Sequence, residues 1–134
     1  MSLARLAVTA GEPAGIGPEL LIRLATIPVA ATLVAITDRR LLQRAAVRCG
    51  VDIELIDDDG SRPTSPHPGM LRVRHTPLAL DEAPGRPDPR NAPHVLATLA
   101  EAADGCLAGR YEAVVTAPLQ KSSINDAGIR FSGH

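Results

Sequence analysis

The stretch RLAVTAGEPAGIGPELLIRLAT, residues 5–26, joins a short apolar run to a helical pattern through a turn rich in glycine and proline. Arg5–Thr9 is typical of a β-strand. Residues 18–26 predict a helix, because proline is favoured in the first turn and Glu19 suits the positive end of the helix dipole. A strand, a Gly-rich turn and a helix in this order indicate the beginning of an α/β fold.

The same alternation continues along the chain. Residues 31–37 (ATLVAIT) form a continuous apolar run, which is typical of a parallel strand covered on both faces. Asp38 is a good N-cap for the next helix, and Gly50 ends it. Further strands are predicted at 51–56, 70–75 and 112–116, loops at 57–69 and 77–89, a long helix from Asn91 to the stop at Gly109, and a short helix at 122–127. The pattern predicts an α/β fold with a mainly parallel sheet and flanking helices.

Three finer expectations concern polar and apolar faces. In the helix that Asn91 opens, one apolar face recurs at helical spacing and consists of Leu96, Leu99, Ala100, Ala103 and Leu107. His94 lies in the first turn of this helix and is expected to face solvent. The run of acids at 57–59 precedes Gly60 and is interpreted as a solvated turn rather than a cation site.

Composition excludes several classes of function. The apolar fraction is 45%, enough for one domain with its own core. The net charge is −1 and the chain has one Tyr and one Phe, which gives no basis for binding nucleic acid or an anionic membrane. No run approaches the roughly 18 apolar residues of a membrane helix, and residues 1–13 do not fit a signal peptide. We therefore expect a cytoplasmic protein.

The turn after the first strand is the first candidate site. Gly11, Glu12, Gly15 and Gly17 lie between a strand and a helix, where the loops of an open α/β sheet form the ligand crevice. The spacing matches neither the dinucleotide fingerprint GxGxxG nor a P-loop. These residues are expected to line a cleft; a tight turn without a ligand is the alternative.

Two further motifs carry candidate binding residues. TAPLQK, residues 116–121, follows a strand and places Lys121 near a helix start, where ammonium and dipole both attract an anion such as phosphate. A solvated surface lysine is the alternative. The last motif ends with Gly133 and His134, an imidazole suited to hydrogen bonding or proton transfer. His67 and His75 match no common metal spacing, so no metal site is expected in this chain.

Taken together, GEPAGIGPEL (residues 11–20) and DGCLAGRYEAVVTAPLQKSSINDAGIRFSGH (residues 104–134) resemble the two signatures of the 4-hydroxythreonine-4-phosphate dehydrogenase family. The resemblance covers the whole chain in order and is weakest from 57 to 90. It differs from many members at Ala117, where they carry glycine.

The resemblance implies a fold related to isocitrate and isopropylmalate dehydrogenases, in a homodimer whose active site lies between two domains. It implies oxidation and decarboxylation of 4-phosphohydroxy-L-threonine with NAD and a divalent metal, giving an amino-ketone phosphate in pyridoxal phosphate biosynthesis. Residues 1–134 would be the N-terminal portion, inactive alone. His134 and Lys121 would bind substrate, while the three metal-binding histidines and most NAD contacts would lie outside this chain.

Three alternatives stay open at this point. Related enzymes act on phosphorylated sugar acids such as phospho-threonate or phospho-erythronate. A phosphate acyltransferase of similar fold would also use Gly-rich turns and a lysine. A binding or dimerisation module without catalysis is the third.

Overall fold

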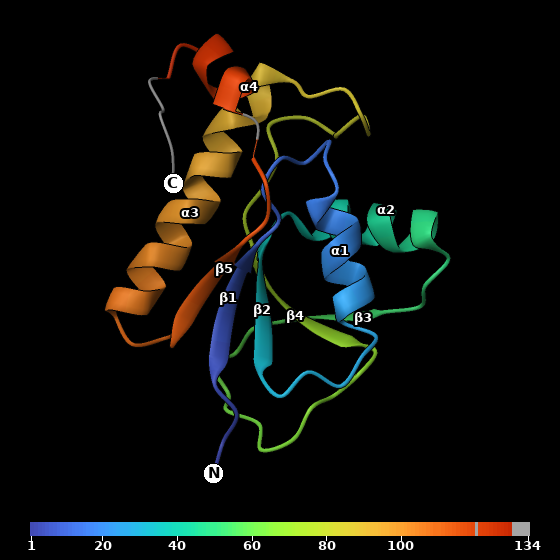
Figure 1. The fold of residues 1–134 in the computed structure, drawn as a ribbon, viewed down its shortest axis with the longest axis vertical. Coiled ribbons are helices and arrows are strands. Elements are labelled where there is room, and N and C mark those ends of the chain that lie inside the picture. Colours follow the sequence, from blue (N-terminus) through green and yellow to red (C-terminus); the bar gives the residue numbers. More distant parts are fainter. Residues whose placement is uncertain (120, 130–134) are drawn as a thin grey trace.

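The computed structural model describes residues 1–119 and 121–129. Within them, five strands form one sheet in the order β3-β4-β2-β1-β5, and all four neighbouring pairs are parallel. The strands are β1 (Arg5–Thr9), β2 (Thr32–Thr37), β3 (Glu54–Asp57), β4 (Met70–His75) and β5 (Ala113–Thr116). The predicted α/β class with a parallel sheet and flanking helices is confirmed (Figure 1).

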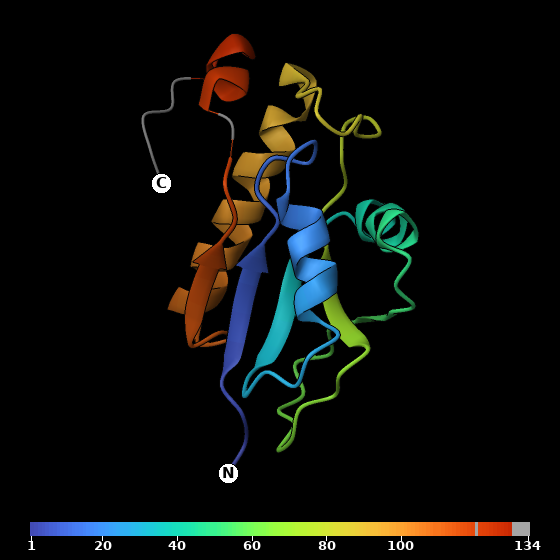
Figure 2. The ribbon, with the colours of Figure 1, turned by 45° about the vertical axis from the view of Figure 1, so that its right-hand side comes forward.

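Helices lie on both faces of the sheet, as Figures 1 and 2 show. The helices are α1 (Gly17–Leu24), α2 (Arg39–Cys49), α3 (Ala92–Leu107) and α4 (Lys121–Asp126), with a 3-10 turn at Pro89–Asn91. α1 and α2 pack against one face, and α3 packs against β1, β2 and β5 on the other. None of the helices that the structure describes is long and apolar enough to cross a membrane.

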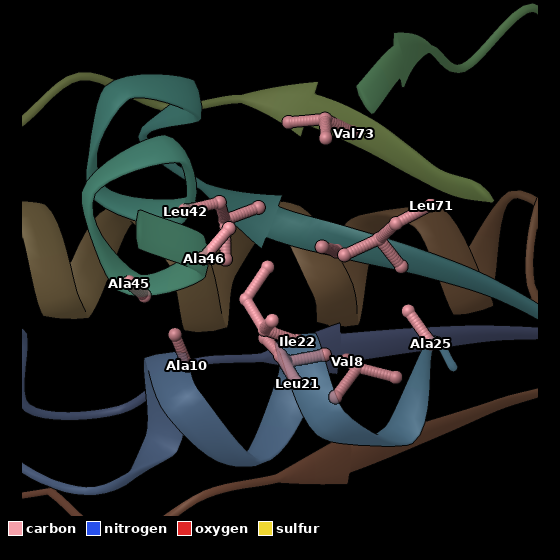
Figure 3. Close-up of a cluster of buried hydrophobic side chains, with 11 residues drawn as sticks. Val8, Ala10, Leu21, Ile22, Ala25, Leu42, Ala45, Ala46, Leu71 and Val73 are labelled. Carbon is pink, nitrogen blue, oxygen red and sulfur yellow. The ribbon is translucent and has the colours of Figure 1, made fainter. Parts of the chain in front are cut away.

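Alternate residues of the central strands enter two separate cores. Val8 and Ala35 belong to the larger cluster with α1 and α2, whereas Ala7, Val34 and Ile36 lie in the cluster beneath α3. Figure 3 shows side chains of α1 and α2 gathered against strand residues in the larger cluster. Burial on both faces is the reason that these strands form continuous apolar runs in the sequence.

Capping residues determine where α2 begins and ends, and they explain why β3 begins later than predicted. Asp38 accepts a hydrogen bond from the Arg40 amide at 2.7 Å, and Gly50 adopts a left-handed conformation with φ 66°. The amide of Val51 then bonds the carbonyl of Ala46. Residue 51 therefore closes the helix, and the strand predicted at 51–56 begins only at residue 54.

The predicted apolar face of α3 is wrong. The buried residues of this helix are Ala92, His94, Val95, Thr98, Ala102 and Gly105, whereas Leu107 is 89% exposed. The reason is steric, because a Cβ at Gly105 would lie 2.2 Å from the ring of Tyr111. Small residues allow α3 to approach that ring and the sheet. Of the predicted face, Leu96 is partly buried against Ala92, Val95 and Ile124, whereas Leu107 points to solvent.

His94 was expected to face solvent, and that prediction is also wrong. Its side chain is buried, with Nδ1 3.0 Å from the carbonyl oxygen of Pro77. Burial lowers the pKa of the imidazole, which therefore favours its neutral form.

The acidic run at 57–59 is only partly a solvated turn. Asp57 and Asp59 are exposed, but the side chain of Asp58 is 6% exposed and forms a bidentate ion pair with Arg5 at 2.9 and 2.7 Å. Arg5 begins the interior strand β1, and its guanidinium also lies 5.6 Å from the centroid of the Tyr111 ring. Asp58 is therefore a structural counter-charge inside the fold.

Candidate functional site at the carboxyl end of the sheet

The loops that follow β1 and β5 lie side by side at the carboxyl end of the sheet, the end at which all five parallel strands finish (Figures 1 and 2). The amide of Ala117 donates to the carbonyl of Thr9 at 3.1 Å, and the amide of Glu12 donates to the carbonyl of Pro118 at 2.9 Å. The first two motifs of the sequence, about 100 residues apart, are thus joined through their backbones.

Two glycines of the first motif make this contact possible. A Cβ at Gly17 would lie 1.8 Å from the carbonyl oxygen of Ala10, and one at Gly11 would lie 2.1 Å from that of Pro118. Gly11 also has a positive φ of 70°. Gly15 is different, because it is exposed and its nearest neighbour would be 3.3 Å away. Gly11 therefore admits the backbone of the second loop, whereas Gly17 admits the carbonyl of Ala10 within the first loop and the side chain of Ala117.

The chain leaves these two neighbouring strands toward opposite faces. From β1 it enters α1, which packs with α2 on one face, and from β5 it enters α4, which packs against α3 on the other. In open α/β sheets, such a switch point at the carboxyl end is where ligands bind. Gly11, Glu12, Gly15 and Gly17 lie in the loop at this end of the sheet, and their role in lining a ligand cleft stays a prediction.

Glu12 is the charged residue of the first loop, and it is buried, with 8% exposure. Its Oε1 accepts a hydrogen bond from the amide of Ala14 at 3.2 Å, and its own carbonyl accepts from the amide of Gly15. Burial raises the pKa of the carboxyl, and the negative charge of Asp88 adds to the rise. The site therefore contains a desolvated carboxylate on a backbone fixed by hydrogen bonds.

A third loop, residues 76–88, runs across the same end of the sheet. The amide of Gly85 donates to the carbonyl of Ala14, which connects this loop to the first motif. Asn91 holds the loop from the start of α3: its Oδ1 accepts from the amides of Ala79 and Leu80, and its Nδ2 donates to Leu80.

The role of Asn91 was missed at the sequence level. It occupies the position before α3 without a side-chain capping bond, and its partners lie 11 and 12 residues away. Asp38 likewise holds the third loop, since its Oδ2 accepts from the amide of Leu78, 40 residues along the chain. An N-cap pattern was the available signal, and it cannot reveal such distant partners.

The remaining candidates are placed only in part. For Lys121 the structure describes the backbone, as the first residue of α4 and so just beyond β5 at the same end of the sheet. His134 lies outside the described residues. Within residues 1–119 and 121–129, no three His, Cys, Asp or Glu side chains gather as metal ligands would.

Two hollows lie at the opposite, amino end of the strands. One of about 50 Å³ lies between the end of α1 and the starts of β2 and β4. A larger one of about 440 Å³ adjoins Arg5, Asp58 and Arg62 beside the amino end of β1. The charged groups of the larger hollow are already paired, Arg5 with Asp58 and Arg62 with Glu112. The carboxyl end therefore stays the better candidate site.

The chain is similar to known proteins over its whole length. It is 51% identical over 129 residues to the 4-hydroxythreonine-4-phosphate dehydrogenase of Chromobacterium violaceum, covering 96% of this chain and 39% of that protein. It is 48% identical over 136 residues to the enzyme of the same name from Pseudomonas aeruginosa, covering 100% of this chain and 41% of that protein. The chain thus spans about 40% of the length of these curated relatives.

Solved structures agree in fold. A 4-hydroxythreonine-4-phosphate dehydrogenase from Klebsiella pneumoniae matches with a TM-score of 0.84 and 27% identity, over 98% of this chain and 42% of that one. One from Burkholderia phymatum matches with a TM-score of 0.87 at 22% identity, over 100% of this chain and 42% of that one.

The sequence model of the family described as "Pyridoxal phosphate biosynthetic protein PdxA" matches residues 29–134, well over half of the chain. The chain therefore belongs to the PdxA family of pyridoxal phosphate biosynthetic proteins.

Proposed function

We propose that the chain is the N-terminal portion of a two-domain 4-hydroxythreonine-4-phosphate dehydrogenase acting in pyridoxal phosphate biosynthesis. The carbon of the substrate's secondary alcohol loses a hydride to NAD, and its hydroxyl loses a proton. The resulting β-keto acid then loses carbon dioxide to give an amino-ketone phosphate. The observation that carries this proposal is the joining of the two family signatures through Glu12 and Pro118 at the switch point of the sheet.

The described residues do not by themselves fit either proposed cofactor. The space that a Cβ would occupy at Gly11 and Gly17 is taken by backbone of residues 10 and 118, so these glycines do not leave an open cradle for a pyrophosphate. No metal-ligand group is present among residues 1–119 and 121–129. NAD and a divalent metal therefore belong to the proposal for the complete protein, with binding groups supplied mainly by residues outside the described part.

Lys121 and His134 keep their proposed roles in binding the phosphorylated substrate. The position of Lys121 after β5 supports this, because the carboxyl ends of parallel strands meet in one crevice. A homodimer in the cytoplasm is likewise proposed for the complete protein.

The test is an NADH-formation assay on chain 1–134 and on a protein of the relatives' full length that contains it. Each receives NAD, a divalent metal and 4-phosphohydroxy-L-threonine, with 4-phospho-erythronate in a parallel arm. We expect NADH only from the longer protein and only with the amino-acid substrate. NADH with phospho-erythronate alone would indicate a sugar-acid enzyme, and no NADH in either arm would contradict the proposed function.

A further inference from the structure

Buried carboxylates of the described chain fall into two kinds. Asp58 is paired with the guanidinium of Arg5, and Glu82, with a side chain 1% exposed, is paired with Arg44 at 2.6 Å. Asp38 has no ion pair, but its two oxygens accept amide N–H groups of Arg40 and Leu78 at 2.7 and 2.9 Å. In each of these three residues, both carboxylate oxygens accept hydrogen bonds.

Glu12 belongs to the second kind. Among the side chains that the structure describes, none is a cation paired with it, and its one hydrogen bond is the 3.2 Å contact with the amide of Ala14. The charge acting on it most strongly is that of Asp88, which has the same sign. A buried carboxylate without a counter-charge is costly, so its presence calls for a group that supplies positive charge.

The backbone that carries this carboxylate is fixed in place. The backbone of Glu12 is held at both ends, by the carbonyl of Pro118 and by the amide of Gly15. Ala14, in turn, is held by Gly85 of the third loop. Three loops thus hold one unpaired acid at the switch point where ligands enter sheets of this kind.

We propose that Glu12 binds the ammonium group of the substrate and selects an amino-acid phosphate over a phosphorylated sugar acid. The inference rests on the proposed function and deepens it. An ammonium group supplies the missing positive charge and donates to the carboxylate oxygen that the Ala14 amide leaves unbonded. A sugar-acid phosphate carries a hydroxyl at that position and leaves the buried charge uncompensated.

The test uses the protein of the relatives' full length with Glu12→Gln, which removes the charge and keeps the shape. We expect the KM for 4-phosphohydroxy-L-threonine and the calorimetric Kd without NAD to rise about 10- to 100-fold, as for loss of a charged hydrogen bond. The inhibition constant of 4-phospho-erythronate and the KM for NAD should stay within about twofold. Glu19→Gln is the matched control, because Glu19 is 44% exposed on the adjoining helix with only a 3.5 Å contact to Arg48.

Several results would overturn the inference while leaving the proposed function intact. An unchanged KM and Kd would do so, as would equal weakening of both phosphorylated ligands, a loss of NAD affinity alone, or a fall in kcat without a change in KM or Kd. Glu12→Asp, which keeps the charge on a shorter side chain, distinguishes packing from charge. If Glu12→Gln does not fold, Glu12→Asp provides the test, and it should retain part of the preference for the amino-acid substrate. Absence of NADH from the unmodified protein would instead contradict the proposed function.

Discussion

A buried charged side chain lies at each end of β1, Arg5 at the amino end and Glu12 just beyond the carboxyl end. The two differ in how completely other groups pair with them. At the amino end, Arg5 is 2% exposed and is bonded to Asp58, to the carbonyls of Ser61 and Arg110, and lies against Tyr111. At the carboxyl end, Glu12 is 8% exposed, and within the described part of the chain its side chain has one backbone donor. A charge with a complete set of partners is typical of structure, whereas an incompletely paired one is typical of a binding site.

The two edges of the sheet differ in a related way. The edge strand β3 carries Glu54 and Asp57, and the guanidinium of Arg39 bonds both Asp57 and the carbonyl of Leu55. β5 carries only apolar residues and Thr116, with Val114 36% and Val115 48% exposed on opposite faces. Natural sheets protect free edges with charge, so β5 has the composition of an interior strand.

The largest expected effect is at the amino end. Arg5→Met leaves Asp58 buried and uncompensated, and should lower the free energy of unfolding of chain 1–134 by about 3–5 kcal/mol, as measured by urea titration. Arg90→Met is the control, because the Arg90 side chain is 74% exposed and solvent screens its pair with Asp88, so the loss of stability should be much smaller. Equal losses in the two variants would show that the buried pair of Arg5 and Asp58 contributes no more to stability than an exposed pair.

The second effect is at the carboxyl end, where Gly17→Ala forces a Cβ against the carbonyl of Ala10. We expect a loss of about 1–3 kcal/mol from overpacking, measured in the same titration. Gly15→Ala should cost clearly less, because Gly15 is exposed and its Cβ would approach no atom closer than 3.3 Å. A loss in Gly15→Ala as large as in Gly17→Ala would contradict the close packing of Gly17 against the carbonyl of Ala10.

A smaller, pH-dependent effect is expected from Glu12→Gln. The pKa of Glu12 is raised in the fold above the ordinary value of 4.5, so the unfolded chain releases this proton first. Stability is therefore lost as pH rises from 4.5 through the raised pKa, and is restored below 4.5. The melting temperature of Glu12→Gln, minus that of the unmodified chain, should therefore increase as pH rises from 4 to 7. A constant difference across this range would show that Glu12 has no raised pKa.

The smallest effect on stability is expected at the exposed edge. Val115→Lys should change the free energy of unfolding of chain 1–134 by no more than about 0.5 kcal/mol, since Val115 is half-exposed. It should nevertheless reduce aggregation, measured by light scattering, because a lysine blocks edge-to-edge pairing. Glu54→Lys on the already charged β3 is the control and should change aggregation little. Similar behaviour of the two variants would remove the contrast between the edges.

Much of the fold follows from local sequence patterns. The apolar runs of β1, β2 and β4 and the caps of α2 were predicted within a residue or two, because steric preferences and capping bonds act over a few neighbours. The candidate loop was found in the same way, from glycines between a strand and a helix. The face of α3 was predicted wrongly, because the ring of Tyr111 and not helical periodicity selects which residues are buried.

The sequence by itself determined the order of strands and helices, the parallel sheet and the family. Only the tertiary structure decided that Gly11 admits backbone from another loop and that Asp58 is the buried partner of Arg5. It also decided that Glu12 has no such partner among the side chains that the structure describes. The physical reason is separation along the chain: these contacts join residues 53 to more than 100 positions apart. The sequence states which side chains are charged. Whether a buried charge has an ion-pair or hydrogen-bond partner depends on which distant residues the fold brings next to it.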